Sequence, residues 1–400
     1  MILLAIVLSC AKPSPPGGEV LNGPWVRRGG RVERLAAVAF QPVDPAGEDA
    51  RWLVDVVGDA QWDAALLTAV QDLVGASSPT GLLGPRATST ALARSGYPGQ
   101  ARFSRLLNRG EPPASLIAPA VQAAARGQVD VALARRAYED GRVLWILGWA
   151  PHRAEMDPIR RDIPLDGGIS LRVDLVDHGE ARLFVERPYA AVEEMALSGG
   201  VARWVDGFHS PGEYRMEVVV SRKGVSEVVL LFSLFVETEV PKLGRLPTAP
   251  DTAPNPAEAE RLLYQLVDQT REQHGLPKVA RFPLFEGLAR EHAALMAHAG
   301  VIAHRIPGVT EGVETKAAEF AHPRARHHEN VAAAASARDA HALVEGSPAH
   351  LANLLCEPCS HLAIGATLEP VLDRVPRLFV TWELLEFPQG PPREIDHYNR

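Results

Sequence analysis

The residues of this chain that are best suited to chemistry are histidines, and they are gathered near its end. Of the 14 histidines, 11 lie after residue 250, and the first 151 residues contain none. Imidazoles can bind a divalent transition metal such as Zn²⁺, and they exchange protons near neutral pH. The sequence therefore predicts that any histidine-based site lies in the last third of the chain.

Two motifs in this region invite a chemical interpretation. His328-Glu329 begins like the HExxH zinc helix of metalloproteases, but position 332 is Ala332, which excludes that motif. The pair His327-His328 is instead typical of a solvated loop. Cys356 and Cys359 have C-x-x-C spacing without the second pair of a zinc ribbon, so they predict a local disulfide or, alternatively, two free thiols.

Composition restricts the class of protein. The chain has 400 residues, of which 46% are hydrophobic and 22% charged, which is typical of folded globular protein. The formal net charge of −8 and the lack of a basic stripe argue against a nucleic-acid partner. The length is sufficient for two to four domains at roughly 100–200 residues each.

The N-terminus resembles a bacterial lipoprotein signal. Residues 2–8 are apolar, Cys10 follows, and residues 11–18 form a polar Pro/Gly/Ser linker. The resemblance implies lipidation of Cys10 and an extracytoplasmic protein, either anchored to the membrane by this lipid alone or secreted. The run is short and lacks a basic stretch, so we expect the true start codon upstream. The alternative is an N-terminal strand with a buried cysteine.

Four prolines in residues 242–256 predict a linker over 242–255 that separates the last domain from the rest. Before it, apolar residues alternate with period two over 169–175 and 214–220, and an apolar run covers 228–236. Residues 160–241 therefore predict a β-sandwich, and Pro211-Gly212-Glu213-Tyr214 resembles the tyrosine corner of immunoglobulin-like domains. Such a domain could be a spacer, an adhesive module or a purely structural unit.

Residues 24–155 predict a mixed α/β domain, with helices over 63–74 and 114–125 and strands over 129–133 and 143–149. In residues 256–390, capping signals at Asn255, Ser336 and Ser347 begin three helices, and a further helix is expected over about 284–299. Strands over 361–368 and 377–384 follow. Helices first and strands last indicate a layered α+β domain.

The last domain also carries a series of motifs in a fixed order. They are His274-Gly275-Leu276-Pro277, residues 288–293, residues 303–308, residues 329–332, residues 347–355 and residues 362–365. Together, over about residues 258–387, they resemble the CAP domain, also called the SCP domain (cysteine-rich secretory proteins, antigen 5, pathogenesis-related 1), in its bacterial branch. The resemblance implies an α-β-α sandwich with a cleft lined by His304, Glu329 and His350.

The chain departs from the family pattern at several positions. His328 stands where a glycine usually precedes the Glu-Asn pair, and Ser347 takes the place of a second acidic residue. The N-terminal domain could be a degenerate CAP-like copy or an unrelated α/β domain. Such a copy would lack the histidine pair, because no histidine precedes residue 152.

Two functions remain open from the sequence. The first is an extracytoplasmic binding module of the cell envelope, whose cleft takes a small apolar or lipid-like ligand or an envelope component, with Zn²⁺ held by His304 and His350. The second is a metal-assisted, peptidase-like hydrolase in which Glu329 is the general base. If Glu329 is itself a ligand, no base remains, which favours binding; whether the chain is an enzyme stays open.

Overall fold

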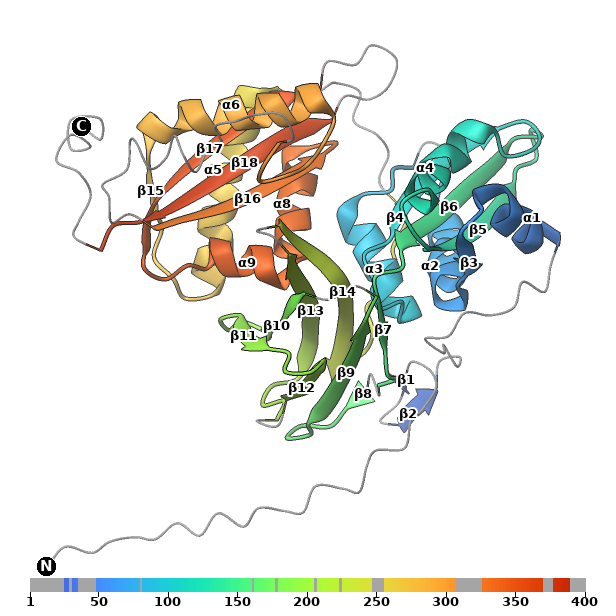
Figure 1. Cartoon of the computed structure of the whole chain (residues 1–400), viewed down its shortest axis with the longest axis horizontal. Helices are drawn as coiled ribbons and strands as arrows, with labels where there is room; N and C mark the ends of the chain where they lie inside the picture. Colours follow the sequence, from blue (N-terminus) through green and yellow to red (C-terminus); the bar gives the residue numbers. More distant parts are fainter. Residues whose placement is uncertain are drawn as a thin grey trace, which may run out of the picture.

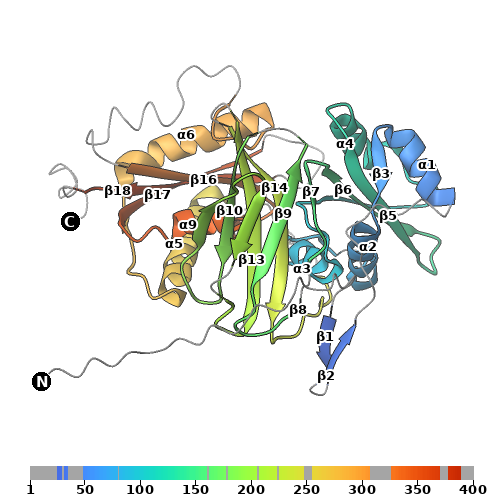
Figure 2. The same cartoon turned by 60° about the horizontal axis from the view of Figure 1, so that its bottom comes forward.

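The computed structural model describes residues 25–28, 31–34, 48–79, 81–159, 162–176, 179–204, 207–222, 225–246, 255–306, 326–369 and 377–388. They include an N-terminal α/β domain, a central β-sandwich and a C-terminal domain whose sheet lies between helices (Figures 1 and 2). The prediction of a mixed α+β fold is confirmed. The predicted signal segment with Cys10 lies outside the described residues. Within the described part, no helix is long and apolar enough to cross a membrane.

The C-terminal domain (residues 255–388) has three layers. Its sheet runs in the order β15 (Ala280–Arg281), β17 (Cys359–Leu368), β18 (Leu378–Glu386) and β16 (Arg326–Ala334). Helix α6 (Pro283–Ala299) covers one face, and α5 (Pro256–Gln273) and α8 (Ala337–Glu345) cover the other, followed by the short α9 (Pro348–Leu354) (Figure 1). Asn255, Ser336 and Ser347 cap their helices through side-chain oxygens, as predicted.

The N-terminal domain repeats this topology. Its sheet order is β3 (Ala60–Trp62), β5 (Val129–Ala137), β6 (Val143–Pro151) and β4 (Arg102–Asn108). In both sheets the first strand pairs with the third in parallel, and the other neighbours are antiparallel. The helices are α1 (Glu48–Val57), α2 (Ala64–Ala76), α3 (Pro85–Ser95) and α4 (Ala114–Ala124). The shared strand order and directions favour a copy of the C-terminal domain over an unrelated α/β domain.

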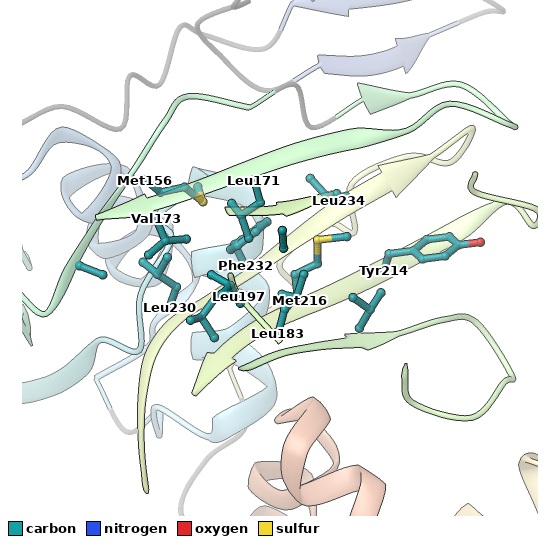
Figure 3. Packing of buried hydrophobic residues seen from close by; sticks show 14 of the residues in the cluster. Met156, Leu171, Val173, Leu183, Leu197, Tyr214, Met216, Leu230, Phe232 and Leu234 are labelled. Carbon is teal, nitrogen blue, oxygen red and sulfur yellow. The ribbon is translucent and has the colours of Figure 1, made fainter. Parts of the chain in front are cut away.

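The central domain is a sandwich of two sheets. One sheet has the order β11 (Glu193–Ala196), β10 (Glu180–Glu186), β13 (Gly212–Arg222), β14 (Val225–Val236), β8 (Asp162–Ile163), and the other β12 (Val201–Trp204), β9 (Ile169–Leu175), β7 (Ala154–Met156). Leu171, Val173, Met216 and Phe232 meet between the sheets (Figure 3). The alternation in β9 buries Leu171 and Val173, as the sequence predicts.

Tyr214 stabilises the corner that leads into β13. Its ring is buried, and its hydroxyl donates to the Ser210 carbonyl at 3.1 Å and accepts from the Ser210 amide at 3.2 Å. Tyr214→Phe should therefore lower the free energy of unfolding by about 1 kcal/mol, because the Ser210 amide loses its acceptor. Urea denaturation would measure the loss. Tyr189→Phe, at a position that is 85% exposed, is the matched control and should have no effect.

Three predictions from the sequence need correction. The sandwich begins at Ala154 rather than residue 160, because β7 pairs with β9. The segment predicted as a linker over 242–255 is packed at its start, since Leu246 is buried and its amide donates to the Ala76 carbonyl. His327-His328 is not a loop pair but part of β16, hydrogen-bonded to β18. A run of histidine, glutamate and asparagine lacks the apolar alternation from which a strand is predicted.

Candidate functional site

A cavity of about 830 Å³ lies where the C-terminal domain meets the sandwich. Helix α9 sits beside β10 and β13 at this junction (Figure 1). His304, Glu329 and His350 all line the cavity. The other walls come from both domains: Arg182, Phe184, Glu194, Val219, Ser226 and Val228 from the sandwich, and Arg326, His327, His328, Ala349, Ala352, Asn353, Cys356, Pro358 and Glu386 from the C-terminal domain.

His304 is oriented by Glu329. Its Nδ1 lies 2.6 Å from Glu329 Oε1, and the carboxylate is almost buried while the imidazole is 48% exposed. The segment that carries His304 is fixed by His292, a buried residue of α6 whose Nε2 lies 3.0 Å from the Ala303 carbonyl and 3.8 Å from Glu329 Oε2. Glu329 therefore holds the ring through Nδ1 and leaves Nε2 to meet a ligand.

His350 is oriented in a similar way from the other side. Its Nδ1 lies 2.6 Å from Ser347 Oγ, in the first turn of α9. Asn330 ties this turn to β16, because its amide donates to the His350 carbonyl at 2.9 Å and its oxygen accepts from Asn353 at 2.9 Å. Burial lowers the pKa of His350 to about 4, and nearby His304 shifts it in the same direction. His350 is therefore neutral at physiological pH, as a metal ligand must be.

The sandwich reaches the site through Glu217, which no motif in the sequence indicates. This fully buried residue of β13 accepts from Ser347 Oγ at 2.8 and 3.0 Å and from the Ala349 amide at 2.6 Å. Its neighbour Arg215 donates to the Glu345 carbonyl at the end of α8. The Glu217 carboxylate thus lies at the start of α9, and the Arg215 guanidinium lies at the end of α8. This is the favourable arrangement of charges for helix dipoles. Burial raises the pKa of Glu217 to about 7, although the Ala349 and Ser347 donors oppose the shift.

A second carboxylate, Glu383, lies directly opposite Glu329 on the neighbouring strand. It is fully buried and bonded to His327 Nε2, whose side chain is only 17% exposed. Burial raises the pKa of Glu383 to about 8; His327 opposes this shift, and Glu329 adds to it. The sequence interpretation of His327 as a solvated residue is therefore wrong, because this histidine balances a buried acid.

Cys356 and Cys359 form a disulfide at the edge of the cavity. Among the described residues, one group of three ligating side chains has its ligand atoms within 4.8 Å of one another, and it consists of His328, Cys356 and Cys359. His304, Glu329 and His350 line one cavity without forming such a group. A zinc ion at His304 and His350 would thus need further ligands from water or from a bound molecule.

The N-terminal domain carries a different polar cluster. Asp130 accepts from Tyr97 Oη at 2.6 Å and from Gln61 Nε2 at 2.6 Å, and His152 Nδ1 lies 3.2 Å away. Burial raises the pKa of the nearby Asp63 to about 7, with Asp130 adding to the shift. These residues bond to one another, so the cluster ties β3, β5 and the end of β6 together rather than facing a ligand.

Three solved structures that match parts of this chain are described as extracellular, secretory or outer surface proteins of bacteria. An extracellular protein of Bacillus anthracis with an SCP domain is 16% identical, over 44% of this chain and 65% of that one, with a TM-score of 0.29. A cysteine-rich secretory protein of Staphylococcus aureus is 11% identical, over 60% and 83%, with a TM-score of 0.26. An outer surface protein of Borrelia burgdorferi is 20% identical, over 32% and 92%, with a TM-score of 0.27.

Two of these neighbours are SCP-domain proteins. The chain spans just under two thirds of the Bacillus protein. No family model and no curated protein matches the sequence. The likeness to SCP-domain proteins is therefore one of partial structural similarity, alongside the ordered motifs of the C-terminal domain.

Proposed function

We propose that this chain is an extracytoplasmic binding protein whose ligand occupies the cavity between the sandwich and the C-terminal domain. The observation that carries the proposal is that two imidazoles, His304 and His350, line one cavity with their Nδ1 atoms already bonded to protein groups. Nε2 of each ring is then left for a ligand, which is the arrangement that outer-shell partners impose on metal-binding histidines.

The walls indicate the chemistry of the ligand. On the sandwich side, Phe184, Val219 and Val228 offer apolar surface, whereas the opposite wall carries the histidines. A small molecule with an apolar body and one polar group fits this asymmetry. Its polar group would reach His304 and His350 directly or through a Zn²⁺ ion, which would take the two imidazoles from the protein and its other ligands from the molecule or from water.

Binding is better supported than hydrolysis. The acidic residues that line the described part of the cavity are Glu194, Glu329 and Glu386. Each is already paired: Glu194 with Arg182, Glu386 with Arg326, and Glu329 with His304. In a metal-assisted hydrolase whose metal is held by His304 and His350, a carboxylate such as Glu329 must activate water, and the carboxylates here are engaged in orienting or neutralising other groups.

Replacing His350 by alanine should abolish Zn²⁺ binding by the oxidised full-length protein, because one of two imidazole ligands is lost. Glu329→Gln should weaken binding about 10- to 100-fold, the usual effect of removing an outer-shell partner of a metal-binding histidine. Isothermal titration calorimetry at constant pH measures both.

The control is His298→Ala, at an exposed position in the last turn of α6, which should leave the affinity unchanged. Zn²⁺ affinity that survives in His350→Ala would place the metal elsewhere. If the unmodified protein takes up no Zn²⁺, a direct interaction of the imidazoles with an organic ligand is the remaining form of the proposal.

A further inference from the structure

His328 places an imidazole nitrogen against the disulfide. The ring nitrogens of His328 and the sulfurs of Cys356 and Cys359 offer ligand atoms within 4.8 Å of one another. In a tetrahedral zinc site, with Zn–S of about 2.3 Å and Zn–N of about 2.0 Å, ligand atoms lie roughly 3.3–3.8 Å apart. Small side-chain adjustments would therefore bring these three atoms onto one ion once the sulfurs separate.

The imidazole is prepared for this role. His328 Nε2 is buried and has no hydrogen-bond partner among the described residues. A side-chain hydrogen bond with Asn353 favours the protonated ring. Burial lowers the pKa of His328, with His327 adding to the shift, so the ring is neutral at physiological pH. A neutral ring with a buried, unsatisfied Nε2 is the form that binds a metal.

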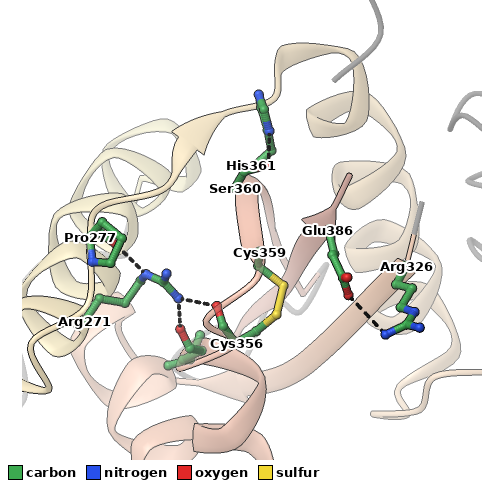
Figure 4. The surroundings of a disulfide bond; sticks show 9 residues. Arg271, Pro277, Arg326, Cys356, Cys359, Ser360, His361 and Glu386 are labelled. Carbon is green, nitrogen blue, oxygen red and sulfur yellow. Dashed lines mark hydrogen bonds and ion pairs between the residues drawn. A yellow bond between two sulfur atoms is a disulfide. The ribbon is translucent and has the colours of Figure 1, made fainter. Parts of the chain in front are cut away.

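The cysteine loop is held in place independently of its disulfide. Arg271, fully buried, donates to the carbonyls of Leu354, Cys356 and Pro277 at 2.8, 3.0 and 2.8 Å (Figure 4). These bonds fix the backbone at Leu354 and Cys356, where the chain enters the turn, and Cys359 at the other end is the first residue of β17, paired with β18. Breaking the sulfur–sulfur bond therefore need not unfold the turn.

We infer that Cys356, Cys359 and His328 form a redox-gated site for a thiophilic metal ion, Zn²⁺, on the wall of the cavity. A dithiol reductant, such as a thiol–disulfide oxidoreductase, transfers two electrons to the disulfide and is itself oxidised to a disulfide, leaving two thiols. Zn²⁺ then displaces two protons from these thiols and binds both sulfurs and His328 Nε2. In the reverse direction, the disulfide form of such an oxidoreductase accepts the two electrons and is reduced to its dithiol, which re-forms the Cys356–Cys359 disulfide and releases the ion.

The fourth position of this ion would face the cavity. Cys356 and His328 both line the cavity, whereas Cys359 is buried behind them. Three protein ligands with one open position is the arrangement in which zinc accepts water or an exogenous ligand. The inference is independent of the proposed role of His304 and His350, which does not involve the sulfurs.

The test uses full-length protein carrying Cys10→Ser, so that one cysteine pair remains. After reduction with a phosphine and removal of the reductant without oxygen, the protein is titrated with Co²⁺, which gives a thiolate-to-metal charge-transfer band when bound by cysteine. The expected result is one equivalent of Co²⁺ with this band, displaced by Zn²⁺, and no band in the oxidised protein. His328→Ala should weaken binding at least about 100-fold, more than the loss of an outer-shell partner does.

His361→Ala is the matched control, since His361 lies two residues beyond Cys359 and bonds Ser360. It should leave the band, and the affinity measured from the band, unchanged. A metal ion held by His304 and His350 would have no sulfur ligand and so would not contribute to this band, which separates the two sites. A reduced protein that shows no charge-transfer band would overturn the inference. So would a Co²⁺ affinity in His328→Ala equal to that of the parent protein.

Discussion

Gly365→Ala should destabilise the C-terminal domain by at least about 3 kcal/mol, the upper range for forcing extra volume into a packed core. A β-carbon at this position of β17 would lie 2.1 Å from the backbone of Ala289 and Arg290 in α6. Backbone atoms of a helix cannot move aside as a flexible side chain can, so α6 would have to lift from the sheet. Urea denaturation and hydrogen–deuterium exchange of β17 and β18 would measure the loss.

The effect should extend to the candidate site. Helix α6 carries His292, which fixes the segment of His304, so a displaced α6 would also weaken Zn²⁺ binding. Gly287→Ala is the matched control, because Gly287 lies in α6 where an added β-carbon would meet only open space, and it should stabilise the helix by about 1 kcal/mol. Equal stability of the two variants would contradict the argument for contact between α6 and β17.

Glu217→Gln should weaken Zn²⁺ binding about 10-fold, the lower end of an outer-shell effect, although residue 217 does not line the cavity, because its carboxylate accepts from Ser347, the outer-shell partner of His350. When Glu217 is ionised, the Ser347 hydroxyl donates to it, so His350 Nδ1–H donates to Ser347 and the Nε2 lone pair is available. A glutamine amide donates to Ser347 instead and reverses the direction of this chain. Calorimetry at pH 8 measures the affinity, and Glu180→Gln, at an exposed position in β10, is the control.

The same substitution should change how stability depends on pH. The pKa of Glu217 rises from 4.5 in the unfolded chain to about 7 in the fold, so the native state binds the extra proton between these values. Stability contributed by this group is therefore greatest below pH 4.5 and falls by about 3 kcal/mol as the pH rises through 7. Glu217→Gln should remove this fall. Parallel pH profiles of the free energy of unfolding for both proteins would contradict the assignment.

Much of the fold could be predicted from local patterns. Capping residues such as Asn255 and Ser336 indicate their helices, and the alternation around Leu171 indicates β9, because both signals depend on neighbours in sequence. Strand β16 could not be predicted in this way because its first residues, His327 to Asn330, are polar. His327, His328 and Glu329 line the cavity, and Glu329 lies opposite the buried Glu383 of β18, so tertiary surroundings override the usual strand pattern.

The candidate site could be predicted only in part. His304, Glu329 and His350 were accessible through ordered motifs, and the structure places all three at one cavity. Glu217 and Glu383 could not be predicted, because each reaches the site through tertiary contacts. Glu217 comes from the sandwich domain, and Glu383 comes from the strand that neighbours β16. A glutamate within an apolar strand, as both are, is the only signal that the sequence offers for a buried acid with a partner.

The side chains with which the sandwich lines the cavity are separate from those that form the core of the sandwich. Phe184, Val219 and Val228 belong to strands whose other faces form an independent core, so substitutions there could alter which molecules fit without disturbing the histidines. Ligand preference could thus diverge through β10, β13 and β14 while the imidazole pair stays constant. A fragment limited to residues 255–388 would retain the histidines but lose the sandwich wall of the cavity, and its affinities would describe an open groove rather than the protein.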